Sequence, residues 1–186
     1  MKHELTKHLI PLLIIFIATS IIWLFGHVAW YNFLILFFGF GLGSFFLDTD
    51  HLIYWFFTHK ELEESRIASL AIKKGDYRSV LTLLEAVHKK HIDLIFHHII
   101  FQLVLVGISL FLFTSTDSIF GKSFLLALNI HLLLDEYVDL QNNPAHLQQW
   151  LFARLPKQLP ISFLMKYLYF ITFLIIIFSF LLIKTK

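Results

Sequence analysis

The sequence predicts an all-α fold: a polytopic membrane helical bundle of about five transmembrane helices, with amphipathic helices on the cytoplasmic side. Three observations predict it. The 186 residues are 58% hydrophobic and have a mean hydropathy of +0.74. Only 15% are charged, against roughly 25% in an ordinary soluble domain. The 22 phenylalanines gather in apolar runs, and a soluble domain of this length has too little interior to bury them. One helical domain over residues 1–186 is expected.

The first two spans come from one uncharged stretch. Residues 9–47 contain no Asp, Glu, Lys or Arg, and two spans need about 20 residues each. We place them at 9–25 and 29–47, because Trp30 and Tyr31 in the intervening GHVAWYN suit a membrane interface. No small-residue cleavage site follows the first run, so we expect an uncleaved helix rather than a signal peptide. The spacing of Gly39 and Gly43 favours close approach of a second helix.

Residues 58–93 have a different character, since they carry most of the charge of the chain. Apolar residues repeat at helical spacing on both sides of Gly75, for example Ile67 with Leu70 and Leu81 with Leu84. This pattern predicts two short amphipathic helices that lie on the membrane surface. The sequence leaves open whether the segment is a lid, a surface anchor or a solvated connector.

Three further apolar runs predict spans at 94–113, 118–135 and 161–183. The run at 118–135 is the weakest because Lys122 interrupts its start, and a re-entrant helix there would reduce the number of spans to four. A polar connection with three prolines precedes the last span, over residues 140–160.

The basic residues predict the orientation. With the N-terminus in the cytoplasm, twelve of the 15 Lys and Arg residues lie on the cytoplasmic side, and only Lys122, Lys184 and Lys186 lie outside. The positive-inside rule therefore predicts a multi-pass protein of the inner membrane with a cytoplasmic N-terminus. The formal net charge of +2 is too small to indicate nucleic-acid binding. Membrane lipids are the expected partners of the predicted spans.

Acids and imidazoles gather at the cytoplasmic ends of four predicted spans. Carboxylates next to hydrocarbon require a partner, and His131 and Asp135 are four residues apart, on one helix face. The chain has no cysteine, so a metal would take only nitrogen and oxygen ligands, which favours Zn, Mn or Fe. We predict a divalent metal site with the ligands His8, Asp48, Asp50, His51, His97, His98, His131 and Asp135.

The remaining histidines and acids carry no such prediction. His3, His59, His88, His91 and His146 are expected at the surface, and Glu136 and Asp139 are expected to be interfacial acids that follow the fourth span.

These motifs resemble the small membrane-bound metal-dependent hydrolases of bacteria and archaea, of the LexA-regulated inner-membrane type. The matching elements, over roughly residues 1–140, are His8 in LTKHLI, the acids and His51 in LDTDHLI, FHHIIF, and His131 with Asp135 in HLLLDEY. Two features depart from that family. Leu47 replaces a proline, and the central block lacks the first of two histidines five apart, so that Asp93 is a candidate replacement ligand.

The resemblance implies a metal-dependent hydrolase. We expect an uncoordinated carboxylate, Asp50 or Asp135, as general base. The location of the site favours a lipid-borne or other small substrate, such as a phosphoester, at the membrane. A non-catalytic metal-binding protein, either a transporter or a scaffold, is the alternative. Transport is less favoured, because the outer halves of most spans are apolar and a transport path requires polar groups through the membrane. Haem binding by facing histidines is disfavoured by the surrounding acids.

Overall fold

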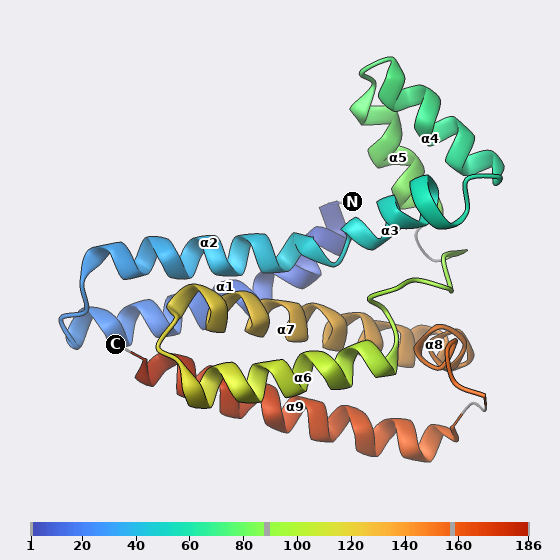
Figure 1. Cartoon of the computed structure of the whole chain (residues 1–186). Helices are drawn as coiled ribbons and strands as arrows, with labels where there is room; N and C mark the ends of the chain where they lie inside the picture. The colour runs from blue at the N-terminus through green and yellow to red at the C-terminus, as the bar shows by residue number, and fades with distance from the viewer. Residues whose placement is uncertain (1, 88–89, 157–158, 186) are drawn as a thin grey trace.

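The computed structural model describes residues 2–87, 90–156 and 159–185, with side chains from Leu9 onward, and every regular element in these ranges is helical. Figure 1 shows the helices α1 (Lys2–Phe25), α2 (Trp30–Phe46), α3 (Thr49–Ile53), the π-helical turn η1 (Tyr54–Thr58), α4 (Glu63–Lys73), α5 (Tyr77–Val87), α6 (Ile99–Ser115), α7 (Ile119–Asn142), α8 (Pro144–Leu151) and α9 (Ile161–Lys184). The all-α prediction is confirmed.

The long helices α1, α2, α6, α7 and α9 run lengthwise beside one another, and α7 is central among them (Figure 1). α7 contacts α1, α2, α6 and α9, and its Leu126 is fully buried in the main core with Leu36 of α2 and Phe178 of α9. The hairpin of α4 and α5 stands away from this bundle at one end (Figure 1). Residues carried by α7 can therefore meet partners from every other long helix.

Length and composition single out one membrane-span candidate among the described residues, α9 at Ile161–Lys184. α2 passes the same test only together with Thr49–Thr58, from which it is bent by 41°. The apolar helices Leu9–Phe25 and Ile99–Ser115 are shorter than a full span. The predicted runs are thus helices, whereas five membrane crossings remain a prediction.

Three boundaries differ from the sequence prediction by several residues. The helix that contains the span predicted at 9–25 begins at Lys2. The span predicted at 94–113 begins as a helix only at Ile99, because the amides of Ile95 and Phe96 bond the Asp50 carboxylate instead of starting a helix. The span predicted to end at 135 continues to Asn142. A further helix, α8, occupies part of the polar connection at 140–160, and it buries Trp150.

Close packing of α2 on α7 depends on two glycines. A Cβ atom added at Gly43 would lie 2.6 Å from the Phe124 carbonyl oxygen and 2.7 Å from Cβ of Ala127, and one at Gly39 would overlap the Ser123 hydroxyl. The predicted close helix contact is therefore made with α7. It places the carboxyl end of α2 directly against the middle of α7.

A series of buried polar residues follows one face of α7. Glu136, Asn129 and Lys122 are spaced seven residues apart and are at most 4% exposed. Glu136 accepts hydrogen bonds from Gln102 Nε2 of α6 and from Tyr167 Oη of α9. Asn129 Nδ2 donates to Ser109 Oγ of α6. Lys122 Nζ donates to Thr185 Oγ1, the residue that follows α9. Glu136, expected to be an interfacial acid, is instead in the interior. These bonds tie α6, α7 and α9 together.

The two amphipathic helices predicted in 58–93 are present as α4 and α5. They close a small second core, in which Trp55 of η1 is buried in one cluster with Ala68 and Val80. Asp76 caps α5 by accepting hydrogen bonds from the amide and hydroxyl of Ser79, and these bonds hold the pKa of Asp76 below its usual range.

Candidate metal centre

Three separate chain segments meet where α2 ends against α7. The DTDH turn follows α2 and supplies Asp48, while the irregular segment 91–98 supplies His97. α7 supplies His131 and Asp135, one helical turn apart. Leu47 anchors the turn because its side chain is completely buried. We refer to Asp48, His97, His131 and Asp135 as the His/Asp cluster.

The donor atoms of this cluster lie close together. Asp135 Oδ2 is 3.2 Å from His131 Nε2 and 3.7 Å from His97 Nε2, and Asp48 Oδ1 is 3.6 Å from His131 Nε2. His97, His131 and Asp135 form a group that can hold a metal ion, with donor atoms all within 4.8 Å of one another. The predicted convergence of distant segments is therefore present, and the DTDH turn reaches His131.

The spacing suits a first-row metal. Metal–ligand bonds of about 2.0–2.2 Å in a tetrahedral arrangement separate neighbouring donors by roughly 3.4 Å. The distances from Asp135 Oδ2 to His131 Nε2 and to His97 Nε2, 3.2 and 3.7 Å, bracket that value. His97 Nε2 is also buried without a hydrogen bond to any described residue. A bound cation would satisfy this nitrogen in place of a hydrogen bond.

Both imidazoles are oriented from their other nitrogen. His131 Nδ1 lies 2.8 Å from the carbonyl oxygen of Ser44, to which it donates as the Nδ1–H tautomer. His97 Nδ1 lies 3.3 Å from Asp50 Oδ2. Metal-binding histidines characteristically make such contacts to a carbonyl or carboxylate. The arrangement directs both Nε2 atoms into the cluster.

Asp50 acts on the surrounding backbone rather than from within the cluster. Its side chain is 1% exposed. Oδ1 accepts a hydrogen bond from the amide of Ile95 (3.0 Å), and Oδ2 accepts one from the amide of Phe96 (2.5 Å). With His97 also beside Oδ2, both carboxylate oxygens are engaged. Asp50 was predicted to be a metal ligand and a candidate general base. It instead supports His97 from outside the His/Asp cluster.

His51 faces a second imidazole. Its Nδ1 lies 2.8 Å from Nδ1 of His91, whose Nε2 lies 2.7 Å from Glu64 of α4. The ring centroids of His51 and His97 are 5.8 Å apart, so His51 adjoins the cluster without belonging to the group of three. His91, expected at the surface, is only 3% exposed. The burial of His91 could not be predicted, because this residue lies in a segment that is rich in charged side chains.

The other predicted residues lie elsewhere. His98 caps α6, where its Nδ1 accepts from the amide of Phe101. The side chain of His8 lies outside the described residues. Asp93, the candidate replacement ligand, is exposed in an ion pair with Arg154. Asp139 accepts hydrogen bonds from His146 and Trp150, on the side of α7 toward α8.

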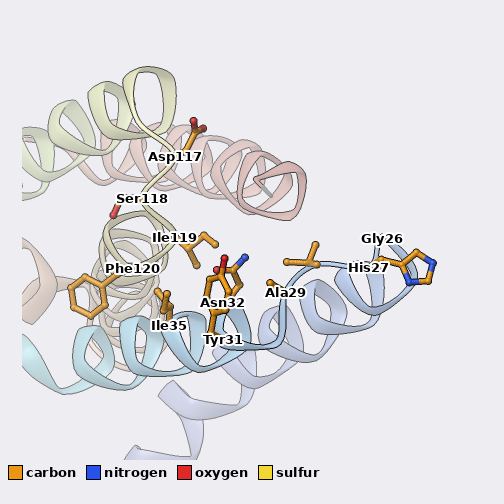
Figure 2. Close-up of a pocket in the computed structure, with 11 residues that line it drawn as sticks. Gly26, His27, Ala29, Tyr31, Asn32, Ile35, Asp117, Ser118, Ile119 and Phe120 are labelled. Atoms are coloured by element: carbon orange, nitrogen blue, oxygen red, sulfur yellow. The ribbon is translucent and has the colours of Figure 1, made fainter.

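A cavity of about 600 Å³ lies at the end of the bundle opposite to the His/Asp cluster, and the α1–α2 and α6–α7 connections form it. It is roughly 20 Å from the cluster along α7, at 1.5 Å per residue. Figure 2 shows His27 and Asp117 at separate edges of this cavity, with Asn32 between them. The side chains that can share a cation, those of the His/Asp cluster, lie at the opposite end of the bundle from this cavity. We therefore assign the candidate metal centre to the cluster and not to the cavity.

Comparison of the chain with family models, with curated proteins and with solved structures finds no match. The hydrolase resemblance drawn from the motifs therefore stays a prediction, and function has to be argued from the site.

Proposed function

We propose that this protein is an integral-membrane, metal-dependent hydrolase that acts on a lipid-borne phosphoester. The observation that carries the proposal is the meeting of His97, His131 and Asp135 from separate parts of the chain, with both imidazoles oriented from Nδ1. Histidines whose Nδ1 atoms are fixed by a carbonyl or a carboxylate are typical of metal sites. A chance cluster of surface side chains lacks these contacts.

The membrane setting is supported by the outer faces of the bundle. Large apolar side chains on the long helices face outward, including Phe25, Phe37, Phe111 and Phe173, each more than half exposed. A soluble protein rarely exposes apolar surface on this scale. We propose that the five long helices cross the membrane, with the N-terminus and the His/Asp cluster on the cytoplasmic side because that side has the excess of Lys and Arg.

The nitrogen and oxygen donors favour Zn, Mn or Fe as the bound ion. A divalent cation held by His97, His131 and Asp135 would supply a water molecule whose pKa is lowered toward about 7.

The residues of the chain supply orientation and proton transfer. Asp48 is the most accessible carboxylate of the cluster, with 38% of its side chain exposed, against 17% for Asp135. Since Asp50 is fully engaged with the backbone, we assign the role of general base to Asp48, which would accept a proton at Oδ1 or Oδ2. Substrate would approach from the side on which Asp48 is exposed.

The test is hydrolysis by detergent-purified protein loaded separately with Zn²⁺, Mn²⁺ or Fe²⁺. Vesicles of phosphatidylglycerol and phosphatidylethanolamine serve as substrate, and released headgroup or phosphate is measured by mass spectrometry. We expect turnover with at least one metal, and a loss of about 10²–10⁴-fold in Asp48→Asn at unchanged metal content. Asp117→Asn, in the distant cavity, is the control. Wild-type protein that releases nothing with any of the three metals contradicts the proposal.

A metal-binding transporter is the second candidate, and the buried polar series on α7 favours it. Glu136, Asn129 and Lys122 continue from the cluster toward the far end of the bundle, although each is satisfied by a neighbouring helix. Uptake of Zn²⁺ or Mn²⁺ into protein-containing liposomes, read with an entrapped fluorescent chelator, separates the two functions. Metal-dependent uptake abolished by Asn129→Leu would favour transport over hydrolysis.

A further inference from the structure

An apolar groove of about 250 Å³ lies between α1 and α2. Leu12 and Phe40 form its buried floor, and the half-exposed Leu13 and Phe37 form its rim. Its single polar lining residue is Ser44, whose hydroxyl donates to the Gly41 carbonyl (2.8 Å). The groove therefore offers hydrocarbon contacts and no open hydrogen-bonding group.

Gly41 keeps this groove open. A Cβ atom added there meets nothing within 4 Å, in contrast with the glycines that pack against α7. Gly41 is therefore not required for close contact between helices. The space beside it is bounded by the apolar side chains of α1 and α2.

The groove ends beside the His/Asp cluster. Phe37, Gly41 and Ser44 follow at intervals of four and three residues, which places them on one face of α2. Asp48 follows Ser44 by four residues, in the turn after α2. The carbonyl of Ser44 is the acceptor for His131, and Asp48 carries the accessible carboxylate. Anything extended along the groove thus has one end at the candidate metal centre.

We propose that the groove binds one hydrocarbon chain of a membrane phospholipid and so presents its anionic phosphoester headgroup to the cluster. The headgroup part of this inference rests on the proposed function. A volume of about 250 Å³ is below the roughly 300–1,000 Å³ of compact small-molecule sites and suits a slender chain. From Leu9 to Phe16 the groove follows α1 for roughly 10 Å, parallel to the expected direction of lipid tails.

Gly41→Leu tests the groove because it places a side chain in open space there. Gly107→Leu is the matched control, since Gly107 is also helical with nothing within 4 Å but lies on α6, away from the groove. In nanodiscs, a phospholipid with a diazirine at the end of one acyl chain is photo-crosslinked, and the labelled peptides are mapped by mass spectrometry. Labelling needs neither metal nor turnover.

We expect labelling of the α1–α2 groove to exceed that of the outward faces of α6 and α9. Gly41→Leu should reduce groove labelling about tenfold, the loss expected when roughly two methylene groups leave an apolar contact. Gly107→Leu should leave it unchanged. Both variants should keep the wild-type metal content, which shows that the site is still folded.

Uniform labelling of all outward faces, or groove labelling unaffected by Gly41→Leu, would overturn the inference, because the groove would then hold only ordinary surrounding lipid. Hydrolysis separates the two proposals. If the function is correct, Gly41→Leu loses turnover on a long-chain phospholipid and retains it on a short-chain analogue with the same headgroup. A groove that is labelled specifically in a protein without hydrolytic activity supports chain binding and contradicts the proposed function.

Discussion

The two imidazoles of the cluster are held by partners of different kinds. His131 lies against a backbone carbonyl, that of Ser44, which no side-chain substitution removes. His97 lies against the carboxylate of Asp50, which also accepts the amides of Ile95 and Phe96. The position of His97 therefore depends on a single replaceable side chain.

Asp50→Asn is expected to weaken metal binding without removing a ligand. An amide NH₂ group in place of one carboxylate oxygen would face a backbone N–H or the His97 ring, and the 94–98 segment would lose an acceptor. Loss of such a supporting contact typically costs 10–100-fold in metal affinity, which competition with a chromogenic Zn²⁺ chelator measures. Asp93→Asn, exposed near the same segment, should bind as wild type. Equal metal affinity in the two variants would show that Asp50 does not support the metal site.

At this scale the sequence was informative where a regular helix determines the geometry. His131 and Asp135 share a face because they are four residues apart on α7, and that pairing is present. His97 and His98 could not be distinguished, since they lie where the backbone is irregular and the helix begins only at Ile99. His91 could not be found, because its burial depends on packing of the α4–α5 hairpin.

At the scale of elements, the contact between α2 and α7 positions the cluster. Gly43 lets α2 approach the backbone of α7, and the next residue, Ser44, supplies the carbonyl that holds His131. The sequence predicted that these glycines would pack closely against some helix. It could not identify α7 as the partner, because glycine spacing indicates a close approach without specifying the element that approaches.

Gly43→Ala is expected to separate the two helices. The added methyl group would sit 2.6 Å from the Phe124 carbonyl oxygen, and overpacking of this kind costs about 1–3 kcal/mol. We expect a lower midpoint of thermal unfolding in detergent and weaker metal binding, because Ser44 moves with α2. Gly41→Ala, whose methyl group meets nothing within 4 Å, is the control. Equal melting and metal binding in the two variants would contradict this role of the contact.

At the scale of the whole molecule, the long helices predicted from composition are present, and among the described residues α9 is by itself long and apolar enough to span a membrane. Composition predicted the helices well, because long uncharged runs have few alternatives to helix in an apolar environment. Composition is less decisive for the number of crossings. α7 carries Lys122 and Glu136 in its interior face, and hydropathy alone cannot separate a helix with a buried polar face from one that does not cross.

The absence of native cysteine makes orientation directly measurable. Asp117→Cys, in the turn between α6 and α7, should react with a membrane-impermeant maleimide in intact cells. Lys73→Cys, at the end of α4, should react only after the membrane is opened. The expected difference follows from the bias of Lys and Arg toward the α4–α5 side. Labelling of Lys73→Cys in intact cells would reverse the proposed orientation.

The central claim is that His97, His131 and Asp135 together hold one divalent cation. The most direct test is the metal content of detergent-purified protein, measured by inductively coupled plasma mass spectrometry in wild type, His131→Ala and the control His146→Ala, whose imidazole bonds Asp139 away from the cluster. We predict about one Zn, Mn or Fe ion per chain in wild type and in His146→Ala, and near-complete loss in His131→Ala. Metal far below one ion per chain in wild type, or equal metal in all three proteins, would contradict the claim.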